Sequence, residues 1–325
     1  MDISIIIISY NTCALLRECL SSIYEKTGGV TYEIFVVDNA SSDESCEMVE
    51  KEFSEVRLIR NSENCGFAKA NNQAIKRSRG KYVFLLNSDT ILENNASKVM
   101  LEFMEKHPRA AVCGPLLLNP DKTVQRSIDT YPTVTSMIIR LSLEALPNRY
   151  RRLMHEKYHP AVFCYSQRYQ ITDGWLTGAA LMIRKAAFTE VGLLDEVYHF
   201  MMEDADFGLA VSRLGWETWF VPEAVVTHLL GASRNSLSDQ QEIDFKIRFL
   251  RQHRYYVRKN MGLVRYGIYR TLVFCCYVNN LIRRVIASAM YPLEKRSLTI
   301  FKIRLARQML LTSMEVGKDR IFEDQ

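Results

Sequence analysis

Polar side chains that could bind a nucleotide or a metal gather in four short loops of the first ninety residues. Each loop follows a run of apolar residues of the kind that forms a buried strand. The loops are residues 9–11, 38–43, 61–67 and 87–90. Asn, Ser and Asp also form turns and helix caps, so a single loop of this kind would carry little information. Four of them after successive strands favour a shared binding site.

The residue types in these loops suit a nucleoside diphosphate that is held by side chains. Asp38 can accept hydrogen bonds from a pyrimidine ring or a ribose, and Asn64 and Asn71 can reach the edge of the base. Asp89 can hold Mg²⁺ or Mn²⁺ against a diphosphate, because hard cations take one or two carboxylates together with phosphate oxygens. The sequence has no GxGxxG after its first strand and no GxxxxGK[ST], which argues against a dinucleotide-binding Rossmann site and a P-loop NTPase.

The elements that must position these loops alternate along the chain. We expect strands at 3–9, 33–37, 56–60 and 82–86, and helices at 13–25, 43–53, 67–78 and 93–106. This order predicts βαβ units and an α/β fold with a mostly parallel central sheet flanked by helices. Parallel strands end at one edge of a sheet, where α/β proteins bind ligands, so the four loops should meet there.

A different class of enzyme is suggested by residues 155–159, which read HEKYH and match the zinc-protease motif HExxH. In that motif both histidines lie on one face of a helix and bind Zn²⁺. Here Pro160 follows at once and would end the helix at the second histidine. We therefore interpret the match as accidental, and stoichiometric zinc in the purified protein would reverse that interpretation.

Eight motifs in order resemble the family 2 glycosyltransferases of the GT-A fold, and within them the bacterial rhamnosyltransferase-type branch. They span residues 3–233, about seventy per cent of the chain. The motifs are SYN (9–11), VVDNASSD (36–43), NCGFAKANNQAI (64–75), LLNSDT (85–90), WLTGAALMIRK (175–185), GLLDE (192–196), FMMEDADFGLAVSRLGW (200–216) and PEAVVTHLLGAS (222–233). The resemblance implies a GT-A type, Rossmann-like catalytic domain over residues 1–233.

Inverting sugar transfer, which the resemblance implies, needs a base on the acceptor hydroxyl and a counterion for the departing diphosphate. By the resemblance, Asp204 is the catalytic base, and Glu203 is the alternative. Both lie at the start of a helix expected over 203–214, where a carboxylate is also favourable for the helix end alone. The resemblance also assigns the metal or diphosphate site to Asp89 and His228, with His228 following an expected strand at 224–227.

The resemblance distributes further residues over the two substrates. A strand expected over 174–183 would pass the acceptor, where Trp175 offers an aromatic face to a sugar and Gly178 allows close approach. Asp206 is assigned to the acceptor as well. Many relatives carry Asp-x-Asp where this chain has Asn87-Ser88-Asp89, so one carboxylate has to hold the Mg²⁺ or Mn²⁺ with less help, and metal dependence stays open. The donor would be bound by Ser9, Asn11, Asp38, Asn64, Gly66, Asn71, Asn87 and Asp89.

The remaining residues, 234–325, form a second region with a different charge. Residues 1–233 have a net charge of −5, whereas residues 234–325 have +10. Helices are expected at 238–260, 263–291 and 298–314, and the second suits a helix that lies in a membrane interface. A basic helical face that simply packs on the catalytic domain is an equally good interpretation. No signature of a DNA- or RNA-binding module occurs, so we expect no nucleic-acid partner.

Together these features predict an inverting, metal-dependent glycosyltransferase. The first choice of donor is dTDP-L-rhamnose and the second is a UDP-hexose, and the acceptor is a saccharide on a polyprenyl-diphosphate carrier. The N-terminus lacks the features of a signal peptide, so we expect a cytoplasmic protein that is peripheral on the inner face of the cell membrane. A non-catalytic scaffold that binds sugar nucleotides is the alternative from another class.

Overall fold

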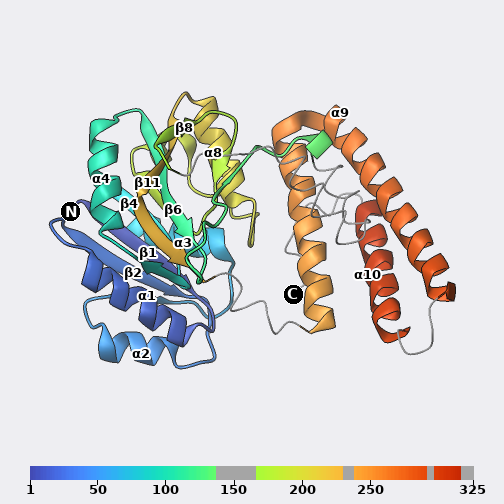
Figure 1. The fold of residues 1–325 in the computed structure, drawn as a ribbon, viewed down its shortest axis with the longest axis horizontal. Coiled ribbons are helices and arrows are strands. Elements are labelled where there is room, and N and C mark those ends of the chain that lie inside the picture. Colours follow the sequence, from blue (N-terminus) through green and yellow to red (C-terminus); the bar gives the residue numbers. More distant parts are fainter. Residues whose placement is uncertain (137–165, 230–237, 291–295, 316–325) are drawn as a thin grey trace. The chain divides into compact units, whose positions relative to one another are not determined.

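The computed structural model describes residues 1–136, 166–229, 238–290 and 296–315, which group into two compact units (Figure 1). The described part of the first unit is residues 1–131 and 166–229. The described part of the second unit is residues 132–136, 238–290 and 296–315. The predicted domain boundary after residue 233 and the HEKYH segment lie outside the described residues. Each unit is described by itself.

The first unit is built on one large sheet whose strand order is β3-β2-β1-β4-β10-β6-β11-β5, with β8 paired to β11. β3, β2, β1 and β4 are parallel, whereas β10 runs antiparallel to both of its neighbours, so the second half of the sheet is mixed. The predicted α/β fold class is confirmed. The strands are β1 (Ile3–Ser9), β2 (Tyr32–Asp38), β3 (Arg57–Arg60), β4 (Tyr82–Asn87), β5 (Thr90–Leu92), β6 (Ala110–Leu118), β8 (Tyr169–Ile171), β10 (Ala180–Arg184) and β11 (Glu217–His228).

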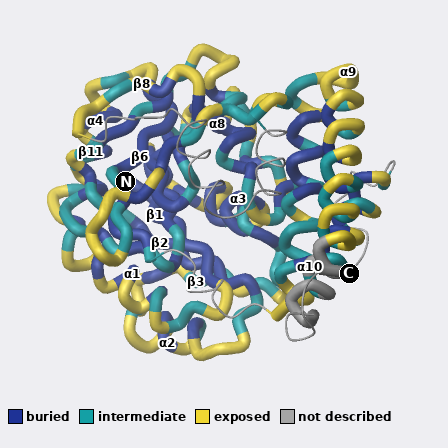
Figure 2. Tube along the Cα trace, turned by 45° about the vertical axis from the view of Figure 1, so that its right-hand side comes forward, coloured by how far each residue is buried: buried dark blue, intermediate teal, exposed yellow. Residues whose placement is uncertain are grey.

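Helices cover both faces of this sheet, which explains why β1 is apolar at nearly every position. Ile3, Ile5 and Ile7 belong to one buried cluster, and Ile6 and Ile8 belong to the other. Successive side chains of a strand point to opposite faces of the sheet. A strand that is covered on both faces therefore needs apolar side chains on both of them. The first cluster is completed by α1 (Cys13–Lys26), α2 (Ser45–Glu52) and α4 (Ala96–Lys106), and the second by α3 (Phe67–Arg77), α7 (Ala187–Val191) and α8 (Glu203–Arg213). Figure 2 shows the buried strands between exposed helix surfaces.

The register of the parallel strands brings the polar loops to one edge. Ser9 of β1 pairs with Asp38 of β2, and Ile8 pairs with Asn87 of β4. The turn that contains Asn87, Ser88 and Asp89 therefore starts next to the residues that follow β1. The hydroxyl of Thr12 lies 3.0 Å from the Oγ atoms of both Ser9 and Ser88, so hydrogen bonds join the two loops.

Two segments differ from the predicted strands. The segment expected as one strand over 174–183 forms β9 (Trp175–Leu176), which pairs with β7 (Ile128–Asp129), and then β10 after a bend. At this bend the amide of Gly178 donates to the side chain of Asp204. The strands expected at 217–221 and 224–227 are one strand, β11, with a register shift between Val221 and Val225 around Pro222.

The second unit consists mainly of α9 (Asp239–Met290) and α10 (Arg296–Met314), which pack on each other. α9 is kinked at Gly262, whose φ of 82° and ψ of 168° are not helical. Arg254 is 1% exposed and donates to the carbonyls of Thr312 and Glu315 at the end of α10. A buried cation here satisfies carbonyls that a helix end leaves without partners. None of the helices within the described residues is both long enough and apolar enough to cross a bilayer.

Candidate active site

Asp38, which we predicted to bind the nucleoside, is a buried carboxylate at the carboxyl end of β2. Its Oδ2 accepts a hydrogen bond from the amide of Ser41 at 2.9 Å. Its Oδ1 is buried and has no hydrogen-bond partner among the described residues. A buried acceptor of this kind costs free energy unless something donates to it, which suits a ligand with N–H or O–H groups.

The neighbouring residues that we predicted to bind the nucleotide-sugar form hydrogen bonds within the protein. Asn11 accepts a hydrogen bond from the amide of Ser42, and Asn64 accepts one from the amide of Gly66. Asn71 is fully buried and donates to the carbonyl of Phe67. Gly66 has a φ of 85°, and a Cβ there would lie 2.7 Å from the backbone oxygen of His199. These contacts shape the loops, Oδ1 of Asn71 is buried without a hydrogen-bond partner among the described residues, and the predicted roles in donor binding stay predictions.

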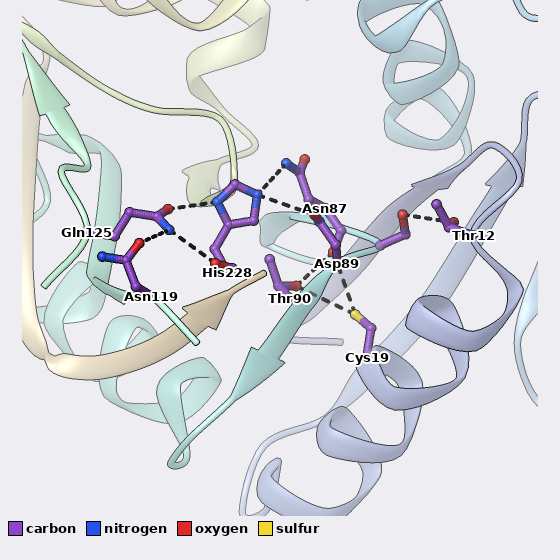
Figure 3. A network of polar contacts seen from close by, with 9 residues as sticks. Thr12, Cys19, Asn87, Asp89, Thr90, Asn119, Gln125 and His228 are labelled. Atoms are coloured by element: carbon purple, nitrogen blue, oxygen red, sulfur yellow. Dashed lines mark hydrogen bonds and ion pairs between the residues drawn. The ribbon is translucent and has the colours of Figure 1, made fainter. Parts of the chain in front are cut away.

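The predicted metal ligands Asp89 and His228 come together at the far side of the same edge (Figure 3). Asp89 Oδ1 lies 3.3 Å from His228 Nε2, and Asn87 Nδ2 lies 3.4 Å from the same nitrogen. Backbone contacts hold the pair in place, because His228 pairs with Thr90 across β5 and β11, and Leu229 donates to the carbonyl of Asp89. The other ring nitrogen, Nδ1, lies 2.8 Å from Oε1 of Gln125.

The pair Asp89 and His228 fits a divalent cation that is completed by phosphate oxygens. Two ligands at about 2.1–2.3 Å on neighbouring positions of one octahedral cation lie about 3 Å apart, close to the separation of these two atoms. No group of three or more His, Cys, Asp or Glu side chains that could hold a metal occurs among the described residues. A two-residue site is the arrangement that Mg²⁺ and Mn²⁺ adopt when a substrate diphosphate supplies the other ligands.

Asp204 and Glu203 at the start of α8 lie in different environments. Asp204 is partly exposed, and its carboxylate accepts hydrogen bonds from the amides of Gly178 at 2.9 Å and Ala205 at 2.8 Å. Burial raises its pKa against the effect of these hydrogen bonds. Glu203 is 6% exposed, and its Oε2 has no hydrogen-bond partner among the described residues. Burial and then the charge of Asp204 raise the pKa of Glu203 to about 8. The exposure of Asp204 and its two amide donors therefore make it the better candidate for a carboxylate base.

The backbone before α8 is strained. Met201 and Met202 have φ values of 83° and 75°, a left-handed conformation that costs most residues other than glycine free energy. Such strain persists only where the surrounding structure holds it, and it gathers at functional sites. Two successive left-handed residues turn the chain sharply into α8 and place both carboxylates within its first turn.

Trp175 lies beside Asp204 and belongs to an aromatic pair. Trp175 stacks on Tyr131, with ring centroids 6.1 Å apart. Gly208 makes room for this pair, because a Cβ there would lie 3.1 Å from Cβ of Trp175. Asp206, by contrast, is buried and accepts a hydrogen bond from the hydroxyl of Tyr198, so its described contact is internal.

We expect Glu203→Gln to remove a pH-dependent loss of stability. In the unfolded chain Glu203 ionises near its usual pKa of 4.5, whereas in the folded protein it keeps its proton until about pH 8. The free energy of unfolding contributed by this group therefore falls as the pH rises from about 4.5 to about 8. Melting temperatures at pH 5 and pH 8.5 should show a gain for the variant that is larger at pH 8.5. Glu18→Gln, at an exposed position of α1, is the control, and equal gains at both pH values would contradict the buried, protonated state.

Comparison with known families gives the site its context. The sequence profile of glycosyl transferase family 2 matches residues 4–173, more than half of the chain. The chain belongs to glycosyl transferase family 2. This confirms the predicted family and the predicted class, a glycosyltransferase. The matched residues include Asp38 and Asp89, whereas Asp204 and His228 lie beyond the match.

A curated relative agrees with the family 2 assignment, and solved structures agree with the fold. An N-acetylglucosaminyl-diphospho-decaprenol L-rhamnosyltransferase of Mycobacterium tuberculosis is 29% identical over 208 residues, which are 60% of this chain and 66% of the relative. The structure of GalNAc-T7 with UDP, GalNAc and Mn²⁺ has a TM-score of 0.53 at 16% identity, over 70% of this chain and 44% of that one. Staphylococcus aureus TarS 1–349 with UDP has a TM-score of 0.51 at 16% identity, over 96% and 90%. The structural likeness shows a shared GT-A fold.

Three features of this family 2 protein were missed from the sequence. Gln125 and Tyr131 lie in a segment without periodic hydrophobicity, and nothing in their spacing links them to His228 or Trp175. The strained pair Met201 and Met202 stands in the motif FMMEDAD, but methionine gives no sign of a left-handed backbone. The acidic residues that follow were the only sequence signal in this segment. They indicate where the helix starts and do not reveal the left-handed backbone before it.

Proposed function

We propose that this protein is an inverting glycosyltransferase that moves a sugar from a nucleoside-diphosphate sugar to a hydroxyl of a saccharide acceptor. The observation that supports this best is the partly exposed carboxylate of Asp204, held by the amides of Gly178 and Ala205. It belongs to the same compact unit as the unsatisfied oxygen of Asp38 and the pair of Asp89 and His228.

In the proposed reaction Asp204 removes the proton from the acceptor hydroxyl. The acceptor oxygen then forms a bond to the anomeric carbon from the face opposite the diphosphate, while the bond to the diphosphate oxygen breaks. The bonding electrons leave with the diphosphate, so negative charge grows there. A divalent cation held by Asp89 and His228 would neutralise that charge when bound. Asp38 orients the nucleoside so that the anomeric carbon faces the acceptor.

The donor we propose first is dTDP-L-rhamnose, and the second is a UDP-hexose. The first choice is supported by the mycobacterial relative, which is named as an L-rhamnosyltransferase. The second is supported by the UDP bound in structures of the same fold. The name of the mycobacterial relative also supports a sugar linked to a polyprenyl diphosphate as the acceptor. Trp175 and Tyr131 offer this sugar an aromatic wall, which favours its apolar ring face.

The proposal is tested by a panel of nucleotide-sugars, each with and without Mn²⁺ or Mg²⁺. A donor at one hundred times its dissociation constant should add about 2.7 kcal/mol to the free energy of unfolding. The stabilising donor is then offered with acceptors, and release of its nucleoside diphosphate is measured. Stabilisation without release from any donor would support the non-catalytic scaffold instead. If no donor stabilised the protein, the proposed function would be wrong.

We further propose that the second unit attaches the protein to an anionic membrane surface. After the kink at Gly262, one face of α9 carries large apolar side chains that are exposed, with Leu263 74% and Val264 80% exposed. Arg265 and Arg283 lie beside this face and are exposed too. An apolar stripe flanked by arginines suits the boundary between acyl chains and anionic headgroups. The stripe comprises Leu263, Val264, Ile268, Phe274, Ile282, Val285 and Ile286.

We expect the double variant Ile268→Glu and Ile282→Glu to bind anionic vesicles at least tenfold more weakly. Each isoleucine that enters the interface contributes about 1.5–3 kcal/mol, and a glutamate adds repulsion from the headgroups. Flotation with phosphatidylglycerol vesicles measures the partition. Leu214→Glu replaces an equally exposed apolar residue of the first unit and should bind as the unaltered protein does. Unchanged binding of the double variant would place the attachment elsewhere.

A further inference from the structure

Gln125 stands at the start of a chain of hydrogen bonds whose direction is set by groups that can only accept (Figure 3). Its Nε2 lies 3.1 Å from the backbone oxygen of His228 and 3.0 Å from Oδ1 of Asn119. A backbone carbonyl has no proton to give, so the atom facing it must be the NH₂ group. The other end of the amide, Oε1, is therefore the atom that lies 2.8 Å from His228 Nδ1.

The orientation of Asn119 leads independently to the same assignment. Thr123 donates its hydroxyl proton to the carboxylate of Asp121 at 2.6 Å, so its oxygen is left to accept. Nδ2 of Asn119 lies 2.9 Å from that oxygen and donates to it. Oδ1 of Asn119 then faces Gln125 as an acceptor, which requires the NH₂ group of Gln125 at that point. Two separate acceptors thus fix the amide of Gln125 in one direction.

The backbone around Gln125 makes this support rigid. The backbone amide of Gln125 donates to the carbonyl of Leu117, and Leu118 pairs with Val124 across a short turn. Lys122 at the tip of the turn contacts Thr227 at 3.2 Å, the residue before His228. Gln125 itself is buried. The turn is therefore fastened to the end of β11. The side-chain amide of Gln125 cannot rotate without losing its hydrogen bonds to Asn119 and to the backbone oxygen of His228.

We infer that Gln125 is a positioning residue that holds His228 with the proton on Nδ1, so that Nε2 is left as the nitrogen that coordinates a cation together with Asp89. An acceptor 2.8 Å from Nδ1 keeps a proton on that nitrogen. Two groups face Nε2: Nδ2 of Asn87 at 3.4 Å, and Oδ1 of Asp89 at 3.3 Å, the oxygen that would share a cation with it. Hydrogen bonds of this kind to the second ring nitrogen orient metal-ligating histidines. The role in metal binding depends on the proposed function, whereas the tautomer of His228 does not.

The tautomer is tested directly by nuclear magnetic resonance on protein labelled with ¹⁵N-histidine. The chain has six histidines, and His228→Asn identifies the signals of His228 by their disappearance. In the unaltered protein without metal we expect a proton on Nδ1 of His228. Gln125→Met should release this preference, so that both tautomers appear, while the signals of the other five histidines show that the fold is kept. Absence of a proton from Nδ1 of His228 in the unaltered protein would overturn the inference.

The second measurement is the affinity for Mn²⁺ in the presence of dTDP or UDP, by isothermal titration calorimetry. Gln125→Met should weaken Mn²⁺ binding about 10–100-fold, as expected when the partner of a metal-ligating histidine is removed. Gln252→Met makes the same change at another buried glutamine, in α9, and should leave the affinity within twofold. Equal affinity of Gln125→Met and the unaltered protein would overturn the role of Gln125 in metal binding. If the unaltered protein bound no Mn²⁺ with either nucleotide, the proposed metal site would be wrong, and the histidine spectrum would decide the role of Gln125 by itself.

Discussion

Asp204→Asn should lower the rate of sugar transfer by about 10²–10⁴-fold, the usual contribution of a general base. The asparagine oxygen can still accept the hydrogen bond from the amide of Gly178, so the backbone around the bend should keep its shape. The variant cannot take a proton from the acceptor hydroxyl. We therefore expect donor affinity to stay within about twofold while kcat falls, as measured by calorimetry and by single-turnover transfer from the donor found in the nucleotide-sugar panel.

Glu203→Gln is the matched control for this result. Because its raised pKa keeps Glu203 protonated at neutral pH, glutamine closely mimics the side chain that is already present. Transfer by Glu203→Gln at pH 7 should stay within about fivefold of the unaltered protein, well above the loss for Asp204→Asn. If Glu203→Gln lost activity and Asp204→Asn kept it, the two residues would exchange roles. Near-full activity of both variants would remove the base from this helix start altogether.

Asp89→Asn should lower kcat/KM by about 10²–10³-fold and remove the dependence of donor binding on Mn²⁺. Asp89 is the only carboxylate in the Asn87-Ser88-Asp89 turn, and its Oδ1 lies 3.3 Å from His228 Nε2. With the charge removed, the departing diphosphate loses the group that would hold its counterion, a type of electrostatic stabilisation that contributes about this much. Donor affinity is titrated against Mn²⁺ for both proteins.

The control for this second variant is Glu63→Gln, which removes an exposed carboxylate from the loop after β3. It changes the net charge by the same amount and touches neither Asp89 nor His228 in any described contact. Its response to Mn²⁺ should match that of the unaltered protein. A donor affinity that rises with Mn²⁺ equally in Asp89→Asn and the unaltered protein would show that this carboxylate does not bind the cation.

The edge of the sheet was predictable because apolar strands precede three of the four loops. β1, β2 and β4 are buried runs, and parallel strands of that kind end together. β6 was not predicted, because Gly114 and Pro115 in its middle are typical of turns. It is nevertheless a strand because it lies between β10 and β11. β5 has three residues, which is too short for periodicity to reveal.

The candidate site was predictable in its residues more than in its contacts. Asp89 and His228 are 139 positions apart, and the family resemblance was needed to place them together before the structure brought them within 3.3 Å. The contact of Asp204 with the amide of Gly178 depends on a bend that interrupts a strand, which no local pattern indicates. The predicted roles of Asn11, from the family resemblance, and of Asn64, from residue type, stay predictions, and the described hydrogen bonds of both side chains close loops.

The kink at Gly262 limits how far the second unit can extend. Fifty-two helical residues in one straight rod would reach about 78 Å at 1.5 Å for each residue. The glycine divides this length, so neither straight part exceeds about 42 Å. A residue with a side chain would resist the backbone angles of Gly262, which lie in a region that only glycine adopts freely. The backbone angles of Gly262 therefore set the direction of the apolar stripe that begins at Leu263. The half of α9 that holds Arg254 can keep a different direction.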